Sequence, residues 1–193
     1  MKRLLQGTAL GLTVATLSAC TAITPVPAGP VALGGPHRVV LGREWSDISA
    51  VMPQKARNVR VLTIDGPLLN RLYLIEGLNT GEGLLKSPAK ERPAPRFHGD
   101  MSATELVEFM SDSVAAMGYQ RIATNKLRPA KVGAKNGYRF DLEAQTESGL
   151  ELRGQAQVAV LEGKLYAVLY LAPAEHYFAA GLPEVEAIMG SQS

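Results

Sequence analysis

The pattern of apolar and polar positions predicts a C-terminal half built from antiparallel strands. Apolar and polar residues alternate over 138–145 and again over 150–160, which is the period-two pattern of strands with one face in water. Residues 165–171 carry only apolar and aromatic side chains, so one face of this strand is predicted to pack on the main helix, while the other either packs under the C-terminal segment or lines a groove. Turn-forming residues at 146–149 and 162–163 separate the three runs. The pattern therefore predicts an antiparallel β-meander.

One amphipathic helix is predicted directly after Ser102. Ser102 and Glu105 have the spacing of a capping box, in which each side chain satisfies a backbone N–H of the other residue. Apolar residues then recur at helical spacing, and Gly118 is predicted to end the helix. The apolar stripe consists of Leu106, Phe109, Met110, Val114 and Met117.

Two hairpins are predicted from turn residues between apolar runs. Asp65-Gly66-Pro67 separates the runs 59–64 and 68–75, which are expected to pair with each other. Asn136-Gly137 is typical of a tight turn, and it is predicted to join residues 138–145 to a strand near 121–128.

The remaining segments complete an α+β domain. Residues 77–100 are rich in Gly, Pro and charge and are predicted to form a long loop, whereas residues 183–189 are predicted to form a short closing helix. The predicted fold class is therefore α+β, with a meander sheet packed by one amphipathic helix and a short C-terminal helix in two layers.

The N-terminus has the features of a secretion signal. Lys2 and Arg3 precede an uncharged, mostly apolar stretch over 4–17. This stretch is too short to span a bilayer core of about 30 Å, so a signal peptide is favoured over a membrane helix. It is followed by Leu17-Ser18-Ala19-Cys20, which resembles the lipobox of bacterial lipoprotein precursors, and Cys20 is the only cysteine of the chain.

The lipobox resemblance implies that residues 1–19 are removed and that Cys20 is acylated. Because two or more acyl chains hold a protein stably on a bilayer, membrane attachment through Cys20 is expected without a transmembrane helix. Thr21 stands where Asp is the usual signal for inner-membrane retention. The expected location is therefore the cell envelope, on the outer membrane and facing the periplasm.

A tether is predicted between the anchor and the domain. Residues 21–36 contain four prolines and three glycines, a density that breaks regular structure. The predicted organisation is a signal peptide at 1–19, the lipidated Cys and a Pro/Gly-rich tether at 20–40, one α+β domain at 41–190, and a tail at 191–193.

Charge and composition exclude several classes of protein. The chain has 193 residues, of which 46% are hydrophobic and 20% charged, which excludes a wholly disordered chain. The 20 Lys and Arg residues exceed the 18 Asp and Glu residues only through Lys2 and Arg3. The mature chain therefore has no net charge, and no nucleic-acid partner is predicted.

No catalytic, cofactor-binding or metal-binding residues are predicted. The segment 81–87 lacks the glycine that precedes the lysine of a phosphate-binding loop, and the sequence contains no nucleophile elbow of the serine hydrolases. The three histidines have no free cysteine to complete a structural zinc site. The chain is therefore predicted not to be an enzyme.

The candidate binding surface is an aromatic cluster near the C-terminus. Aromatic side chains with a polar tip are enriched at interfaces, but the same residues could form a second small core beneath residues 174–190. The cluster consists of Tyr166, Tyr170, His176, Tyr177 and Phe178.

The order of elements over 40–190 resembles the PsbP/Mog1/DcrB-like α+β group, with a lipobox and a stalk before it. The resemblance implies a non-enzymatic accessory protein and transfers no functional residue. Two functions are open. The first is an accessory or scaffold lipoprotein that binds another envelope protein through the exposed side of the meander or the 77–100 loop. The alternative is a small-ligand or lipid carrier with an apolar pocket between helix and sheet.

Overall fold

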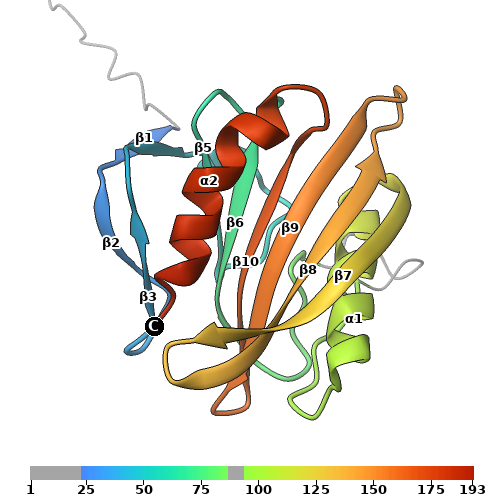
Figure 1. Cartoon of the computed structure of the whole chain (residues 1–193). Coiled ribbons are helices and arrows are strands. Elements are labelled where there is room, and N and C mark those ends of the chain that lie inside the picture. Colours follow the sequence, from blue (N-terminus) through green and yellow to red (C-terminus); the bar gives the residue numbers. More distant parts are fainter. Residues whose placement is uncertain (1–22, 87–93) are drawn as a thin grey trace, which may run out of the picture.

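A computed structural model describes residues 23–86 and 94–193, so the predicted signal peptide and Cys20 lie outside the described residues. Its elements are β1 (Thr24–Val26), β2 (Gly29–Ala32), β3 (Arg38–Leu41), β4 (Trp45–Asp47), the short 3₁₀ helix η1 (Ser49–Val51), β5 (Val59–Thr63), β6 (Arg71–Leu78), α1 (Ala103–Ala116), β7 (Gln120–Val132), β8 (Lys135–Gln145), β9 (Glu151–Leu161), β10 (Lys164–Pro173) and α2 (Tyr177–Gly190). Eight strands form one antiparallel sheet in the order β1-β4-β5-β6-β10-β9-β8-β7, and β2 and β3 form a separate pair (Figure 1). The α+β class and the meander β7 to β10 are confirmed.

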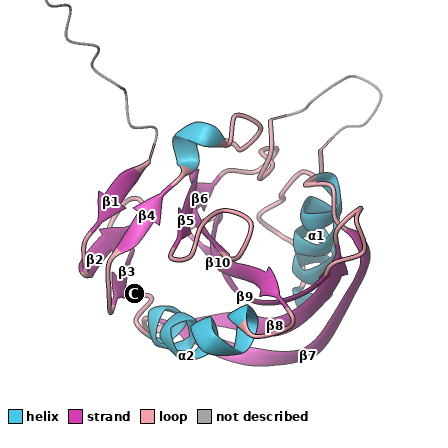
Figure 2. Ribbon diagram, turned by 90° about the horizontal axis from the view of Figure 1, so that it is seen from above, coloured by secondary structure: helices cyan, strands magenta, loops and turns pink. Residues whose placement is uncertain are grey.

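The two helices cover opposite faces of the sheet (Figure 2), so the domain has three layers where two were predicted. The side chains of the central strand β10 alternate between the layers. Ala167 and Leu169 belong to the core under α1, whereas Val168 and Tyr170 belong to the core under α2. This placement explains why β10 is apolar at every position.

The predicted helix is confirmed as α1. The backbone N–H of Ser102 donates to the Glu105 carboxylate at 2.7 Å, and the Glu105 N–H donates back to the Ser102 hydroxyl at 3.4 Å. The helix ends before Gly118, which has a φ of 96° that only glycine adopts without strain. Most of the predicted stripe is buried against the sheet, while Met117 lies at its margin.

The predicted tether is wrong from residue 24 onward, because residues 24–41 belong to the folded domain. Strand β1 pairs with β4, and β2 pairs with β3. Leu33 and Val39 are fully buried in the core under α2. The prolines are compatible with these strands because β1 is an edge strand, where a missing N–H breaks no ladder hydrogen bond.

The C-terminal residues are also part of the domain. Ser193 exchanges two backbone hydrogen bonds of 3.0 Å with Arg38 of β3. The predicted tail at 191–193 is therefore held against the same segment that was expected to be a tether.

Both predicted hairpins form, but their turns differ from the prediction. Strand β6 begins at Arg71, because the residues before it continue the turn after β5. The second turn lies at 133–134, and Asn136 and Gly137 are paired within β8. A Cβ at Gly137 would lie 2.5 Å from the Val158 carbonyl oxygen. Close packing of neighbouring strands, and not a turn, thus requires this glycine.

The predicted long loop contributes residues to the core, and the predicted closing helix is longer than expected. Leu84 and Phe97 of the loop are buried in the core under α1. Helix α2 starts at Tyr177 and runs through Pro183, because Tyr177 and Phe178 pack against the core under α2. Neither described helix is long and apolar enough to cross a membrane.

Candidate functional site

The predicted aromatic surface divides between the core and the surface. Tyr166 and Tyr170 are 6% and 0% exposed and lie under α2, so these two residues form the second core and not an open groove. The Tyr170 hydroxyl donates to the Tyr177 carbonyl oxygen at 3.1 Å, and its ring stacks on that of Phe178. His176 is exposed at the start of α2. A binding role for His176, Tyr177 and Phe178 stays a prediction.

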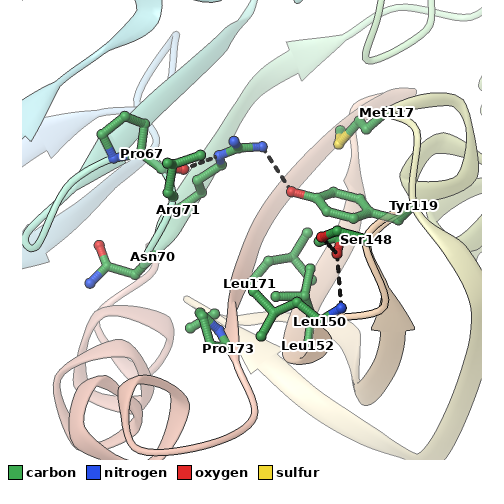
Figure 3. Close-up of a pocket in the computed structure, with 13 residues that line it drawn as sticks. Pro67, Asn70, Arg71, Met117, Tyr119, Ser148, Leu150, Leu152, Leu171 and Pro173 are labelled. Carbon is green, nitrogen blue, oxygen red and sulfur yellow. Dashed lines mark hydrogen bonds between the residues drawn. The ribbon is translucent and has the colours of Figure 1, made fainter.

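A groove lies where the C-terminal end of α1 meets the turn between β5 and β6 (Figure 3). It consists of two adjoining cavities of about 410 and 450 Å³, which share Pro67, Leu68, Arg71 and Met117. The first cavity extends towards the turn at 146–150 and the end of β10. The second extends towards residues 51–55 and the folded part of the long loop.

The rim of this groove is apolar and accessible to solvent. Leu68 is 79% exposed, Val51 48% and Leu150 46%. These are three of the six large hydrophobic side chains exposed within the described part of the chain. Exposed apolar residues that gather around a concave surface are typical of a binding site.

Arg71 lines both cavities, and Figure 3 shows it in the first. Its Nε–H donates to the Pro67 carbonyl oxygen at 2.6 Å, and Nη1 donates to the Tyr119 hydroxyl at 2.8 Å. No carboxylate of the described residues forms an ion pair with Arg71. Since a guanidinium has five N–H donors, Arg71 keeps unused donors and an unneutralised positive charge.

Two further polar groups line the second cavity. Tyr73 is 2% exposed, and its hydroxyl interacts with Arg71 and Tyr119 without a well-formed hydrogen bond to any described residue. Burial raises the pKa of Tyr73 to about 12, with Tyr119 adding to the rise and Arg71 opposing it, so the hydroxyl keeps its proton. Lys55 also lines this cavity, and burial lowers the pKa of its ammonium group.

The chemistry offered by the groove is binding through charge, hydrogen bonds and apolar contact. Its lining contains hydroxyl groups and Lys55 but no His, Cys, Asp or Glu. Elsewhere in the described ranges, no group of three or more such residues is placed to hold a metal ion.

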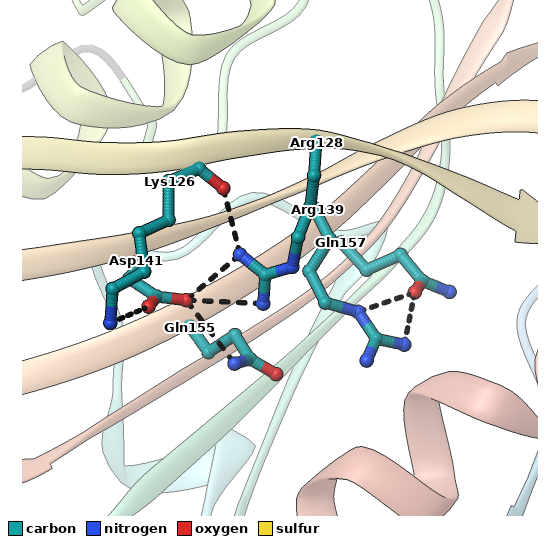
Figure 4. A network of polar contacts seen from close by, with 6 residues as sticks. All are labelled: Lys126, Arg128, Arg139, Asp141, Gln155 and Gln157. Atoms are coloured by element: carbon teal, nitrogen blue, oxygen red, sulfur yellow. Dashed lines mark hydrogen bonds and ion pairs between the residues drawn. The ribbon is translucent and has the colours of Figure 1, made fainter.

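A second candidate surface lies on the hairpin of β7 and β8, which we call the basic hairpin (Figure 4). The Asp141 carboxylate accepts from Lys126 at 3.1 Å, from Arg128 at 3.2 Å and from Gln155 at 3.2 Å. Burial alone raises the pKa of Asp141, but the hydrogen bonds from Lys126 and Gln155 and the Arg128 charge outweigh burial and lower it. Asp141 is therefore ionised at neutral pH.

The basic hairpin has more positive charge than Asp141 can balance. Arg128 and Arg139 are direct cross-strand neighbours, an arrangement that by itself destabilises a sheet. Arg139 donates to the Gln157 amide oxygen and to no carboxylate in the described structure. Residues 113–140 contain six of the 20 Lys and Arg residues and no Asp or Glu, so the rest of the chain has 14 basic and 18 acidic residues. The net charge of the chain is near zero, but its basic residues are concentrated in 113–140 and its acidic residues lie elsewhere.

Comparison with known proteins identifies the fold. Neither a protein-family model nor a curated protein matches the sequence. The solution structure of cyanobacterial PsbP (CyanoP) from Synechocystis sp. PCC 6803 aligns with a TM-score of 0.52 over 97% of both chains, at 13% sequence identity. The chain has a PsbP-like fold. This result confirms the predicted resemblance of the α+β domain, and at this identity it concerns the fold alone.

The sequence contains a signal for part of the groove, in the strand that carries Arg71 and Tyr73. Arg71 interrupts the apolar run 68–75, and Tyr73 is two residues away and therefore on the same face of the strand. A charged residue on a strand face expected to be buried indicates a site. Tyr119 could not be identified in this way, because only the tertiary structure brings it to Arg71.

Proposed function

We propose that this chain is a non-catalytic accessory domain of the bacterial cell envelope, held on the membrane by acylated Cys20 and facing the periplasm. In this proposal the basic hairpin docks onto an acidic surface of another envelope protein. The main observation behind this proposal is the opposed pair Arg128 and Arg139, of which only Arg128 forms an ion pair with a described carboxylate, that of Asp141. An acidic partner would neutralise the remaining positive charge.

The position of the basic hairpin favours a protein partner over the anchoring membrane. Thr24 begins β1 at one edge of the sheet, and β7 is the opposite edge (Figure 1). Three residues lie between Cys20 and Thr24, so the two positions are at most about 14 Å apart. An acylated Cys20 would therefore keep the β1 edge near the bilayer and leave the β7 edge free for a partner.

Site-specific photo-cross-linking in intact cells tests the docking. A cross-linker at position 135 in β8 should give one discrete adduct, whereas a cross-linker at exposed position 57 should not. Arg128→Glu should abolish the adduct, and the matched charge reversal Arg57→Glu should leave it unchanged. An adduct that survives Arg128→Glu, or the lack of any adduct at position 135, would overturn the proposal.

The anchor is tested separately. Metabolic labelling with a clickable palmitate analogue should label the wild type, and Cys20→Ala should lose both the label and retention in the membrane fraction. A soluble, unlabelled wild type would contradict the anchor.

A second function, carriage of a small ligand or lipid, is supported by a different observation. The groove between the end of α1 and the sheet has an exposed apolar rim and an uncompensated charge at Arg71. This surface is separate from the basic hairpin, so the two functions are compatible.

A further inference from the structure

We propose that the groove binds an amphipathic anion, with its oxyanion head on Arg71 and Tyr73 and its apolar chain against Leu68 and Met117. This inference rests on the second function above, ligand carriage, and it adds the chemical class of the ligand and the residues that select it. It is independent of the docking proposed for the basic hairpin.

The charge of the groove selects an anion. Arg71 and Lys55 line it, and its lining contains no Asp or Glu. The C-terminal end of α1 also reaches the groove, and its dipole is equivalent to about half a negative charge. Asp47 and Glu76 act on Lys55 from outside the lining, so the excess of positive charge in the groove is centred on Arg71, which pairs with no described carboxylate.

The hydrogen-bonding groups select an acceptor. Tyr73 presents a buried hydroxyl beside Arg71 and Tyr119 that makes no well-formed hydrogen bond with a described residue, and a buried donor with a poor partner is costly. Because Tyr73 stays protonated at neutral pH, it can donate to an oxyanion. The Tyr119 hydroxyl already accepts from one N–H of Arg71, which fixes the guanidinium while its other donors stay available.

The walls select an apolar chain. Cavities of about 410 and 450 Å³ lie in the size range of small-molecule sites, roughly 300 to 1,000 Å³. Met117 and Leu68 are common to both cavities, so one chain can contact them while its head lies at the junction marked by Arg71. A small hydrophilic anion would leave these walls uncovered.

Isothermal titration of the full chain carrying Cys20→Ala, which removes any competing acyl group, tests the inference. Decanoate and decyl phosphate supply the two oxyanion heads, decanol supplies the chain without charge, and acetate supplies the head without a chain. We expect at least one decyl anion to bind at least about tenfold more tightly than decanol, since hydrogen bonds to charged groups are the strong ones. Acetate should show no measurable binding.

Three variants assign the contacts. Arg71→Met should weaken binding of the decyl anion by about tenfold or more and leave decanol unchanged, since it removes charge but keeps apolar bulk. Tyr73→Phe, which removes one hydroxyl, should weaken the same binding by about fivefold. Arg57→Met, an exposed arginine outside the groove, should have no effect.

The outcomes separate this inference from the docking proposal. Equal affinity for decanol and both anions, measurable acetate binding, or an unchanged affinity in Arg71→Met would overturn the oxyanion site. Arg128→Glu should leave anion binding intact. Loss of the cross-link at position 135 with intact anion binding would count against docking alone, whereas absent anion binding with an intact cross-link would count against the groove alone.

Discussion

Replacing Leu33 by Ala tests whether residues 24–41 belong to the folded domain. Leu33 is 0% exposed and packs in the core under α2, within a segment whose Pro and Gly content predicts an extended tether. If the segment were a tether, shortening one apolar side chain would leave stability unchanged. If it is docked as the structure shows, the substitution leaves a cavity.

The expected magnitude follows from burial. Leu→Ala at a fully buried site costs about 2 to 5 kcal/mol through lost apolar burial and the remaining cavity. For a domain of this size, each kcal/mol lowers the melting temperature by about 2 to 4 °C, so a decrease of about 4 to 20 °C is expected. Val40 lies in the same segment but is 43% exposed. Val40→Ala should therefore change stability by about 0.5 kcal/mol or less.

The fluorescence of the single tryptophan provides the assay. Trp45 is 1% exposed and belongs to the same core as Leu33, so urea unfolding of this core changes its environment. Leu33→Ala should shift the urea midpoint strongly, and Val40→Ala should not. If Leu33→Ala lies within about 0.5 kcal/mol of the wild type, as expected for an exposed site, the docking of residues 24–41 is refuted.

Three further predictions concern particular groups. Tyr73→Phe should stabilise the ligand-free protein by about 1 kcal/mol in urea unfolding, because it removes an unsatisfied buried hydroxyl; a loss of stability would mean that the hydroxyl has a partner. Asp141→Asn should cost about 1 kcal/mol at pH 7. Because the pKa of Asp141 is lowered by folding, this cost should shrink as the pH falls through 3.8 and vanish below the folded pKa, and a pH-independent cost would contradict the ion pairs. Gly137→Ala should destabilise by about 1 to 3 kcal/mol through the clash with the Val158 carbonyl, whereas the exposed Gly190, where an added Cβ would meet nothing within 4 Å, should tolerate Ala better.

Local signals were sufficient for much of the fold. The capping box of Ser102 and Glu105 acts within one helical turn, so it can be predicted without knowledge of the rest of the chain. The period-two pattern of β8 likewise reports which of its faces is buried, whereas in β9 the polar side chains of Gln155 and Gln157 are buried as well, against the prediction of a face in water. The run 165–171, apolar on both faces, is a strand as predicted, and both of its faces are buried.

Other features depended on partners that are distant in sequence. Leu33 is buried because α2 and β10, more than 130 residues later, provide the core that it enters. The sequence around it carries no signal of this contact, so its prolines and glycines suggested a coil. The prediction of a turn at Gly137 is wrong for the same reason. The carbonyl oxygen that requires a glycine there belongs to Val158 of β9, which the local sequence does not reveal.

The candidate sites show the same division. The amino-acid order by itself determined the helix, the meander and the prediction of an acylated Cys20. Only the tertiary structure placed Arg71, Tyr73 and Tyr119 around one groove and opposed Arg128 to Arg139 across two strands. The physical reason is that helix caps and strand periodicity act over a few residues, whereas burial and charge pairing depend on which distant segments come into contact.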